Sequence, residues 1–201
     1  MTTTNRSLAT GTILHLADST KRKWAQGEVR EIAAGKLGPD SKLLPAEGKE
    51  WDWRLSVASI EAAGDFTPYG GFDRTLTVIA GELLELTIDG TAHAMEALRP
   101  LKFAGGSTAA AALPTGDVLA LNLITRTGAV RGNVRIVELS KKREQHLFGA
   151  QFGVLLQGKA TVLRGESEDP LELRDTVIGG EEGSPRISGR GFMAVVSLDL
   201  P

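Results

Sequence analysis

The residues of this chain that could hold a transition metal are its three histidines. Imidazole and carboxylate groups bind such metals when several of them converge on one ion. His15, His93 and His146 are separated from one another by at least 53 positions, and no two of them form a His-x-His pair. We therefore predict no metal site and no cofactor, with His93 as a partly exposed structural residue and His146 as a solvated one.

Side chains that commonly act as nucleophiles are missing or lack their usual context. The chain has no cysteine, which rules out thiolate catalysis, disulfides and thiolate metal sites. It has no Gly-x-Ser-x-Gly segment, and Ser184 and Ser188 lie among turn-forming residues. The glycine pairs at 105–106 and 179–180 precede no helical pattern whose N-terminus could bind a phosphate. Acyl transfer and nucleotide binding are therefore poor hypotheses.

Polar side chains embedded in an apolar strand are better candidates for a binding site. Residues 118–125 form an apolar run that contains Asn122 and is followed by Arg126. In an extended strand, Ala120, Asn122 and Arg126 point to one side while the neighbouring leucines point to the other. Because a buried polar group is costly unless it is paired or reserved for a ligand, we predict that Asn122 and Arg126 line a barrel mouth.

Five further residues join this predicted ligand site. Arg54 and Ser56 share one face of an alternating strand, and Arg74 follows a glycine turn. An arginine there could hold a carboxylate through two hydrogen bonds. Trp24 and Gln26 precede the next strand and could form one side of a small pocket. The structural alternatives are an ion pair with a buried acid for Arg54, a tie between loop and sheet for Arg74, and a core position for Trp24.

Charge and composition exclude several partner classes. The 201 residues carry 23 basic and 25 acidic side chains, a net charge of −2, scattered along the chain rather than clustered. This distribution gives no electrostatic footprint for nucleic acid or an anionic membrane. The first seven residues are polar, and no apolar stretch is long enough for a signal peptide or a membrane span. Together with the absence of cysteine, these features predict a cytoplasmic protein.

The elements that must position these side chains are predicted to be β-strands. Twenty-four glycines separate short apolar or alternating runs, and long helical patterns are scarce. The clearest hairpin spans Asp89-Gly90, a dipeptide that tolerates the positive φ values of a type I′ turn. Residues 35–49 are predicted to be a surface loop. The predicted strands, which indicate a sandwich or barrel, are 12–16, 29–33, 53–60, 83–88, 91–97, 101–103, 118–125, 133–139, 152–156, 160–163, 176–178 and 192–198.

A weak internal repeat suggests two similar halves. Three features recur in the same order 75 to 77 positions later in the chain. The first is an apolar pair followed by a spacer, a glycine and a charged residue, at 78–83 and again at 155–160. The second is a Leu-Arg pair, at 98–99 and 173–174. The third is a glycine before an apolar run, at 116 and 191. Chance similarity is the alternative. The conserved order favours duplication, with halves at about 1–125 and 126–201.

Seven segments also occur in a characteristic order and spacing. They are Trp-Ala-Gln-Gly-Glu-Val-Arg-Glu-Ile at 24–32, Trp-Asp-Trp-Arg-Leu-Ser-Val-Ala at 51–58, Gly-Asp-Phe-Thr at 64–67, Gly-Phe-Asp-Arg-Thr-Leu at 71–76, Val-Ile-Ala-Gly at 78–81, Phe-Ala-Gly at 103–105 and Leu-Asn-Leu-Ile-Thr-Arg at 121–126. Together they resemble the HutD/Ves family of the cupin superfamily. The resemblance covers roughly residues 20–130, and the remainder is similar only to generic cupin-like β-structure.

The resemblance implies a cupin-like, RmlC-like jelly-roll fold, built as a double β-barrel or sandwich of the bicupin type. It also implies a bacterial protein associated with histidine utilisation, closer to small-ligand sensing or restraint of the pathway than to a defined reaction. Metal-dependent cupins use a His-x-His pair, which this chain lacks. Ala25-Gln26 replaces the family's Lys-Asn, Glu28 replaces a glycine, and Ile124 replaces a common methionine. If the Lys-Asn pair touches ligand in relatives, we expect the ligand preference here to differ.

Three functions are open from the sequence. The first is binding of a small carboxylate metabolite, such as formylglutamate or urocanate, by a monomer or homodimer. The second is a metal-independent isomerase or hydrolase that uses a carboxylate such as Glu82, Glu85 or Asp73. The third is an interaction module with an exposed apolar patch and no polar pocket. Arginine and amide groups without an acid–base pair favour the first, a protein that is not an enzyme.

Overall fold

The part of the chain that the structure describes folds into three antiparallel sheets with very little helix. The computed structural model describes residues 7–46 and 50–201. In these ranges the helical structure amounts to a single 3-10 turn, η1 (Leu16–Asp18). The prediction of an all-β protein is confirmed. A helix long and apolar enough to cross a membrane does not occur within the described residues.

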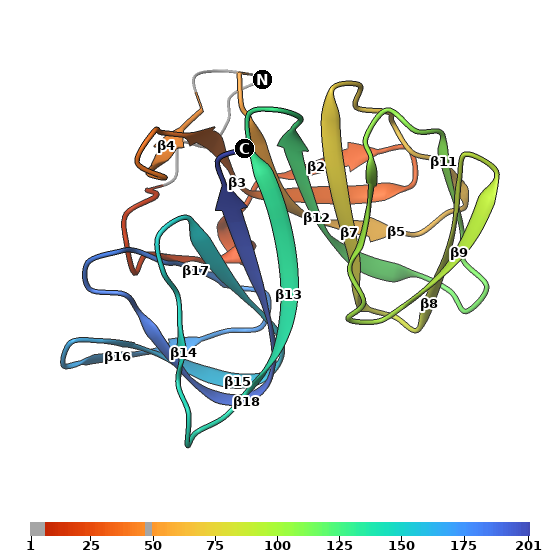
Figure 1. The fold of residues 1–201 in the computed structure, drawn as a ribbon. Helices are drawn as coiled ribbons and strands as arrows, with labels where there is room; N and C mark the ends of the chain where they lie inside the picture. Colours follow the sequence, from red (N-terminus) through yellow and green to blue (C-terminus); the bar gives the residue numbers. More distant parts are fainter. Residues whose placement is uncertain (1–6, 47–49) are drawn as a thin grey trace.

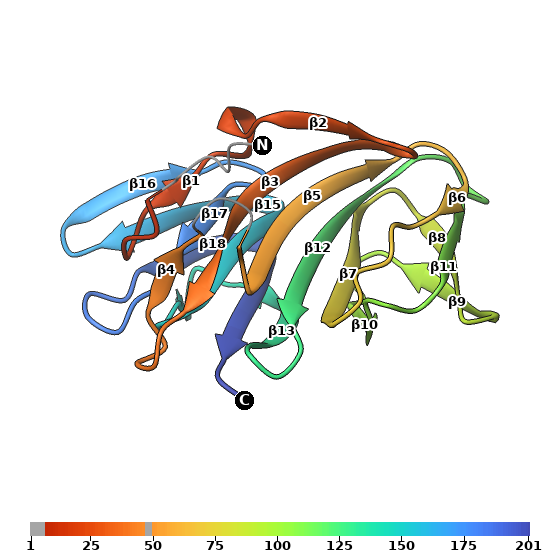
Figure 2. The same cartoon turned by 90° about the horizontal axis from the view of Figure 1, so that it is seen from above.

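The central sheet of seven strands lies between the other two sheets. In Figure 2 its strands β2, β3, β5 and β12 run side by side across the molecule. The predicted strands 53–60 and 118–125 lie at its middle, as expected for runs rich in apolar residues. In spatial order the sheet consists of β10 (Leu101–Ala104), β7 (Phe72–Ala80), β12 (Val118–Arg126), β5 (Trp53–Ile60), β3 (Gly27–Leu37) and β2 (Lys21–Trp24), with β4 (Leu43–Pro45) paired to β3.

A four-stranded sheet faces one side of the central sheet. It contains the predicted hairpin, in which Asp89 and Gly90 both have positive φ, 47° and 82°. The type I′ prediction is therefore confirmed, because that turn needs positive φ at both central residues. The spatial order is β6 (Gly64–Asp65), β11 (Ala109–Ala112), β8 (Leu83–Ile88) and β9 (Thr91–Glu96).

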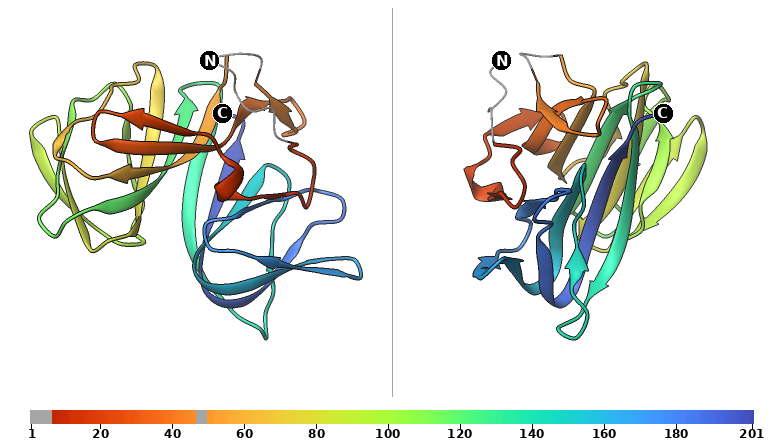
Figure 3. Two further views of the ribbon diagram at one scale, coloured as in Figure 1. Left: turned by 180° about the vertical axis from the view of Figure 1, so that it is seen from behind. Right: turned by 60° about the vertical axis from the view of Figure 1, so that its left-hand side comes forward.

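The third sheet lies on the other side of the central sheet (Figures 1 and 3). It has seven strands. The two predicted strands 152–156 and 160–163 are one strand, with a register shift between Leu155 and Gln157. The short β1 brings the N-terminal segment into this sheet. The order is β1 (Ile13–Leu14), β17 (Thr176–Ile178), β15 (Gln151–Arg164), β18 (Arg186–Asp199) and β13 (Arg131–Leu139), with β14 (Gln145–His146) on β18 and β16 (Ser167–Leu171) on β15.

The loop prediction for residues 35–49 is partly wrong. Strand β3 continues to Leu37, and β4 returns to pair with it, so much of the segment is sheet. Residues 47–49 lie outside the described part of the chain. Gly38 and Pro39 therefore mark the short turn of a hairpin, whereas Gly35 and Pro45 are paired with each other inside its strands.

Both faces of the central sheet are buried, which explains its apolar strands. On one face, Trp53 and Leu121 pack against Phe152 of the third sheet, with the Trp53 and Phe152 ring centroids 5.1 Å apart. On the other face, Val78 and Ala120 pack against Leu84 of the four-stranded sheet and its neighbours. This second face also carries polar residues.

Candidate functional site

A pocket of about 140 Å³ opens on the face of the central sheet that looks toward the four-stranded sheet. Five of the seven residues predicted to bind a ligand line it, namely Trp24, Arg54, Ser56, Arg74 and Asn122. The other lining residues are Arg22, Val29, Glu31, Ala58, Thr67 and Tyr69. Strands β2, β3, β5, β7 and β12 and the loop before β7 therefore all contribute to one site.

Strand pairing places three polar residues in a row across the pocket floor. Ser56 lies opposite Asn122 of β12 on one side and opposite Glu31 of β3 on the other. Paired residues of adjacent strands project from the same face of a sheet. Alternation sends Leu121 and Leu123 to the opposite face, into the core shared with the third sheet. The two-sided pattern predicted for this strand is confirmed.

Arg74 is the most deeply buried charge in the pocket lining, with 8% of its surface exposed. Its Nε donates a hydrogen bond to Oδ1 of Asn122 at 2.8 Å, and its guanidinium lies 4.6 Å from the ring centroid of Phe66. Among the described residues, no carboxylate lies within ion-pair distance of it. Burial away from water lowers the pKa of Arg74 to about 10, Tyr69 opposes this shift, and the charge of Arg54 adds to it.

Arg54 presents a second guanidinium to the pocket. Its Nη2 donates to the Tyr69 hydroxyl at 2.9 Å, and the group lies over the rings of Trp51 and Tyr69 at 4.8 and 5.2 Å. Aromatic faces attract cations and limit their movement. Within the described ranges Arg54 also forms no ion pair, so the predicted alternative of a buried acid partner finds no support. Arg54 and Arg74 therefore both present an oriented guanidinium to the pocket, which Arg22 also lines, and Glu31 is the acidic lining residue.

Ser56 and Trp24 complete the lining in different ways. The Ser56 hydroxyl is buried and has no hydrogen-bond partner among the described residues. An unpaired buried hydroxyl costs about 1–3 kcal/mol, so its place in the lining makes it a donor available to a guest. The Trp24 indole already donates to the Ser59 carbonyl at 3.2 Å and packs edge-on against Phe66. It forms an apolar wall rather than a polar contact.

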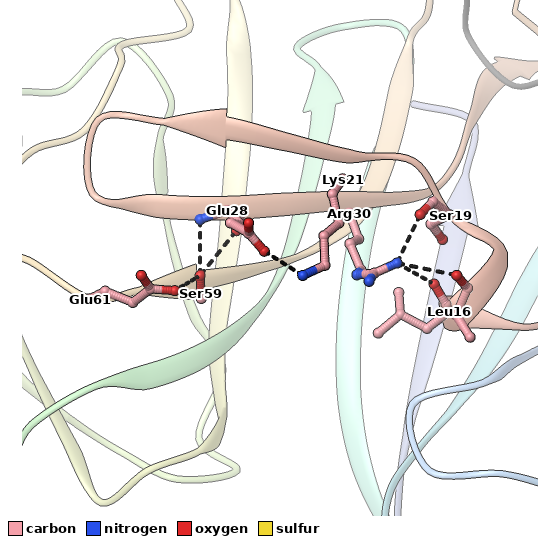
Figure 4. Close-up of polar contacts among 8 residues, drawn as sticks. Leu16, Ser19, Lys21, Glu28, Arg30, Ser59 and Glu61 are labelled. Atoms are coloured by element: carbon pink, nitrogen blue, oxygen red, sulfur yellow. Dashed lines mark hydrogen bonds and ion pairs between the residues drawn. The ribbon is translucent and has the colours of Figure 1, made fainter.

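The β2–β3 hairpin that carries Trp24 is fixed by the contacts drawn in Figure 4. Lys21 pairs with Glu28 across the hairpin at 2.9 Å, and the Glu28 amide donates to the Ser59 hydroxyl of β5 at 2.9 Å. Arg30 donates to the carbonyl of Ser19 at 2.8 Å. Glu28, which replaces a family glycine, therefore has a structural partner in this chain.

The remaining two predicted residues lie outside the pocket. Arg126 is on the same face as Asn122 but lies four residues further along the strand. At the usual rise per residue this separates the two by about 13 Å, which places Arg126 beyond the pocket. Its Nε pairs with Asp52 at 2.6 Å and its guanidinium covers Phe72 at 4.6 Å. Gln26 is buried, with its amide packed against Gly64, and its Oε1 has no partner among the described residues.

Four polar lining residues were missed by the sequence interpretation. Glu31 follows the alternation of its strand, and Arg22 alternates with Trp24, so the same reasoning that selected Ser56 could have found both. Thr67 and Tyr69 lie in the loop between β6 and β7, where no periodic pattern predicts the direction of a side chain.

The lining residues of the pocket do not fit a metal centre. No histidine lines the pocket, and in the described ranges no three side chains of histidine, aspartate or glutamate come together. The carboxylates predicted for an enzyme also lie elsewhere. Glu82 and Glu85 are exposed at the four-stranded sheet, and Asp73 pairs with Lys102 at 3.4 Å.

Solved structures share this fold at low sequence identity. A conserved protein of unknown function from Pseudomonas aeruginosa PAO1 superposes with a TM-score of 0.79 and 21% identity, covering 95% of this chain and 100% of that one. HutD from Pseudomonas fluorescens SBW25 gives 0.73 and 24%, covering 94% and 98%. The oxalate decarboxylase of Lactobacillus farciminis gives 0.65 and 10%, covering 96% and 87%. A cupin-like fold is therefore confirmed.

A family model matches more of the chain than the sequence segments that showed the resemblance. The HutD model matches residues 16–195, and so includes the region after residue 130 in which the sequence showed only generic β-structure. Most of the chain is covered. The chain therefore belongs to the HutD family.

Proposed function

We propose that this protein binds a small carboxylate metabolite in the pocket of the central sheet. The observation that carries the proposal is the burial of Arg74 without an acidic partner among the described residues. Removing a guanidinium from water is costly, and a protein usually compensates with an internal carboxylate. Here the compensating anion would be the ligand.

The hydrogen bonds of Arg74 leave donors for this ligand. Its Nε is used by Asn122, which fixes the plane of the guanidinium, and no hydrogen bond to a described residue engages its two terminal nitrogens. A carboxylate could accept from both of them, as arginine pairs with carboxylates in two-point geometry. Arg54 adds a second positive charge, and the Ser56 hydroxyl is a further donor.

Pocket size and the remaining lining residues restrict the ligand. A volume of about 140 Å³ suits a small metabolite rather than a polymer or a large cofactor. Trp24, Val29 and Ala58 suit a short apolar body, and Glu31 suits an N–H group. Formylglutamate and urocanate each combine a carboxylate with an N–H group, and both remain our candidates.

The biological role that we propose is restraint of histidine utilisation in the bacterial cytoplasm through binding of such a metabolite. Membership of the HutD family supports it. The Lactobacillus farciminis oxalate decarboxylase, a neighbour in fold, was solved as a formate complex, so this fold can hold a small carboxylate. We keep a monomer or a homodimer as the expected assembly.

We also propose that the chain consists of two similar halves, as in a bicupin, with the boundary near residues 125 and 126. Positive φ values recur in the same order at residues 75 to 77 positions apart, Gly81 and Gly158, Leu98 and Arg174, and Gly116 and Gly191. A matching hydrogen bond accompanies them, since the Leu98 amide donates to the Val78 carbonyl at 2.8 Å and the Arg174 amide to the Leu155 carbonyl at 2.7 Å. Repeated backbone geometry of this kind supports duplication.

A thermal-shift panel tests the binding proposal. Formylglutamate, urocanate, formate and matched neutral amides are titrated into the protein, Arg74→Met and Arg126→Met. A ligand at 100 times its Kd stabilises the folded state by about 2.7 kcal/mol. We expect carboxylates to stabilise the unsubstituted protein and Arg126→Met but not Arg74→Met. No shift with any carboxylate, or an equal shift in Arg74→Met, would contradict the proposal.

A metal-independent isomerase or hydrolase is a second candidate, because one carboxylate does line the pocket. Glu31 lies in a row with Ser56 and Asn122, and a pocket carboxylate can act as a general base. Turnover of a bound carboxylate, followed by NMR and abolished in Glu31→Gln with binding retained, would favour the enzyme. Binding without turnover would favour a protein that binds the metabolite without catalysing a reaction.

A further inference from the structure

A second hollow, of about 740 Å³, lies on the third sheet and shares no lining residue with the pocket of the central sheet. One wall is formed by the consecutive residues Arg135–Leu139 of β13, and the other by the segment 140–145 that leads into β14. Successive side chains of a strand point to opposite faces of its sheet. Arg190 and Gly191 of β18 line it as well, and Gly191 is paired with Leu139 at the end of β13. The hollow therefore borders the C-terminal end of β13, and we call it the β13 edge groove.

The backbone along this groove is an open strand edge. Strand β13 pairs with β18 over its full length, from Arg131 opposite Asp199 to Leu139 opposite Gly191. Among residues 7–46 and 50–201, no other strand pairs with β13 and no backbone hydrogen bond reaches its outer edge. Figure 1 shows β13 as a long strand at the front of this sheet, followed by the turn that leads to β14. An unpaired edge of this length can accept one more strand.

The side chains around the groove are predominantly basic. Five cations line it, namely Arg135, Lys141, Lys142, Arg143 and Arg190. All five are exposed, and none forms an ion pair with a described residue. Of the two acidic lining residues, Glu144 is neutralised by Arg186 at 2.9 Å. The groove therefore has a net positive charge, although the chain as a whole has a net charge of −2.

We propose that the β13 edge groove binds an extended, acidic polypeptide segment of a partner protein, which adds to the third sheet as a strand next to β13. The partner's backbone would pair with the free N–H and C=O groups of the edge, and its carboxylates would meet the five cations. A peptide suits this surface better than a nucleic acid, because a strand edge offers alternating donors and acceptors, whereas phosphates can only accept hydrogen bonds. Binding here is independent of the carboxylate pocket.

Fluorescence anisotropy with labelled peptides tests the proposal on the full chain at about 150 mM salt. The probe is a ten-residue peptide of alternating glutamate and valine. One control peptide has lysine in place of glutamate, and another keeps the glutamates but has proline at alternate valines, which prevents strand pairing. A single-stranded DNA of ten nucleotides tests the other polyanion. The variants are Lys142→Glu/Arg143→Glu and, as a matched control on the first half, Lys23→Glu/Lys42→Glu, all at exposed positions.

We expect saturable binding of the acidic peptide, weakened at least tenfold by Lys142→Glu/Arg143→Glu and less than twofold by Lys23→Glu/Lys42→Glu. The proline peptide should bind at least tenfold more weakly, and the lysine peptide should not bind. Absence of saturable binding, equal binding of the proline peptide, or tighter binding of the DNA would each overturn the proposal. Circular dichroism confirms that both variants fold. Because the groove and the pocket share no residue, loss of carboxylate binding leaves this result unaffected.

Discussion

The pocket of the central sheet and the apolar interior of the third sheet differ in the side chains that their strands direct inward. In the pocket, Ser56, Arg74 and Asn122 occupy buried positions between apolar neighbours. In the third sheet, the corresponding interior is filled by aliphatic and methionine side chains, among them Leu155, Val162, Ile187 and Met193, with almost no exposed surface. The central sheet thus borders a polar cavity, whereas the interior of the third sheet is a packed apolar core.

This difference indicates where the molecule can bind a small ligand. A packed apolar interior gains stability from every buried methylene, and it offers no directed interactions to a guest. Buried arginine, amide and hydroxyl groups give up that stability, and proteins retain such groups chiefly where they serve binding or catalysis. The variants below exchange the properties of the two regions one residue at a time.

The largest effect is expected when a polar group is placed in the packed interior. Leu155→Asn keeps a similar shape but buries an amide without a partner and removes apolar contacts. We expect the free energy of unfolding to fall by about 3–5 kcal/mol in a urea titration. Leu155→Met is the control, with a loss below about 1.5 kcal/mol. A loss this small for Leu155→Asn would mean that the third sheet tolerates polar groups as the pocket does.

The opposite exchange in the pocket should stabilise the unliganded protein. Arg74→Met removes a buried cation whose pKa is lowered to about 10 by loss of water. Because the substitution also leaves the buried Oδ1 of Asn122 without its donor, which offsets part of the gain, we expect the free energy of unfolding to rise by only about 1 kcal/mol in the absence of ligand. The matched variant Arg126→Met removes an arginine that pairs with Asp52 near the surface, and should lose about 0.5–1 kcal/mol. Destabilisation by Arg74→Met would show that Arg74 holds the fold together.

A smaller effect is expected for the unpaired hydroxyl of the pocket. Ser56→Ala removes a buried Oγ that has no partner among the described residues. The free energy of unfolding of the unliganded protein should therefore rise by about 0–1 kcal/mol in a urea titration. Affinity for a carboxylate metabolite, measured by calorimetry, should fall severalfold if the hydroxyl donates to the ligand. Unchanged affinity would restrict recognition to Arg74 and Arg54.

The smallest effect concerns pH. Arg74 is charged below its pKa of about 10, and a ligand carboxylate is ionised above about pH 5. Affinity for formylglutamate, which has no group that titrates in this range, should therefore be nearly constant from pH 6 to 9 and fall about twofold at pH 10, where half of the Arg74 guanidiniums lose their proton. An affinity that falls between pH 6 and 7.5 would point to recognition by a histidine instead.

Residues in long alternating strands were the ones that sequence reasoning located well. The faces of β5 and β12 follow from their patterns, and these patterns selected Arg54, Ser56 and Asn122. The same reasoning placed Arg126 on the correct face, but it could not show that the pocket covers only part of that face and ends before Arg126. The position of Tyr69 could not be predicted, because its direction depends on a loop that crosses from one sheet to another.

The sequence alone determined that the chain forms many short strands, that a type I′ turn joins β8 to β9, and which strand faces carry polar groups. These properties depend on local periodicity and on the φ preferences of single residues. Only the tertiary structure decided that Arg74 meets Asn122 from 48 positions away, that Arg126 instead meets Asp52, and that Arg190 joins the cations at 135–143. The physical reason is that strand order and register bring distant residues together, and the hydrophobic periodicity of a single strand determines neither of them.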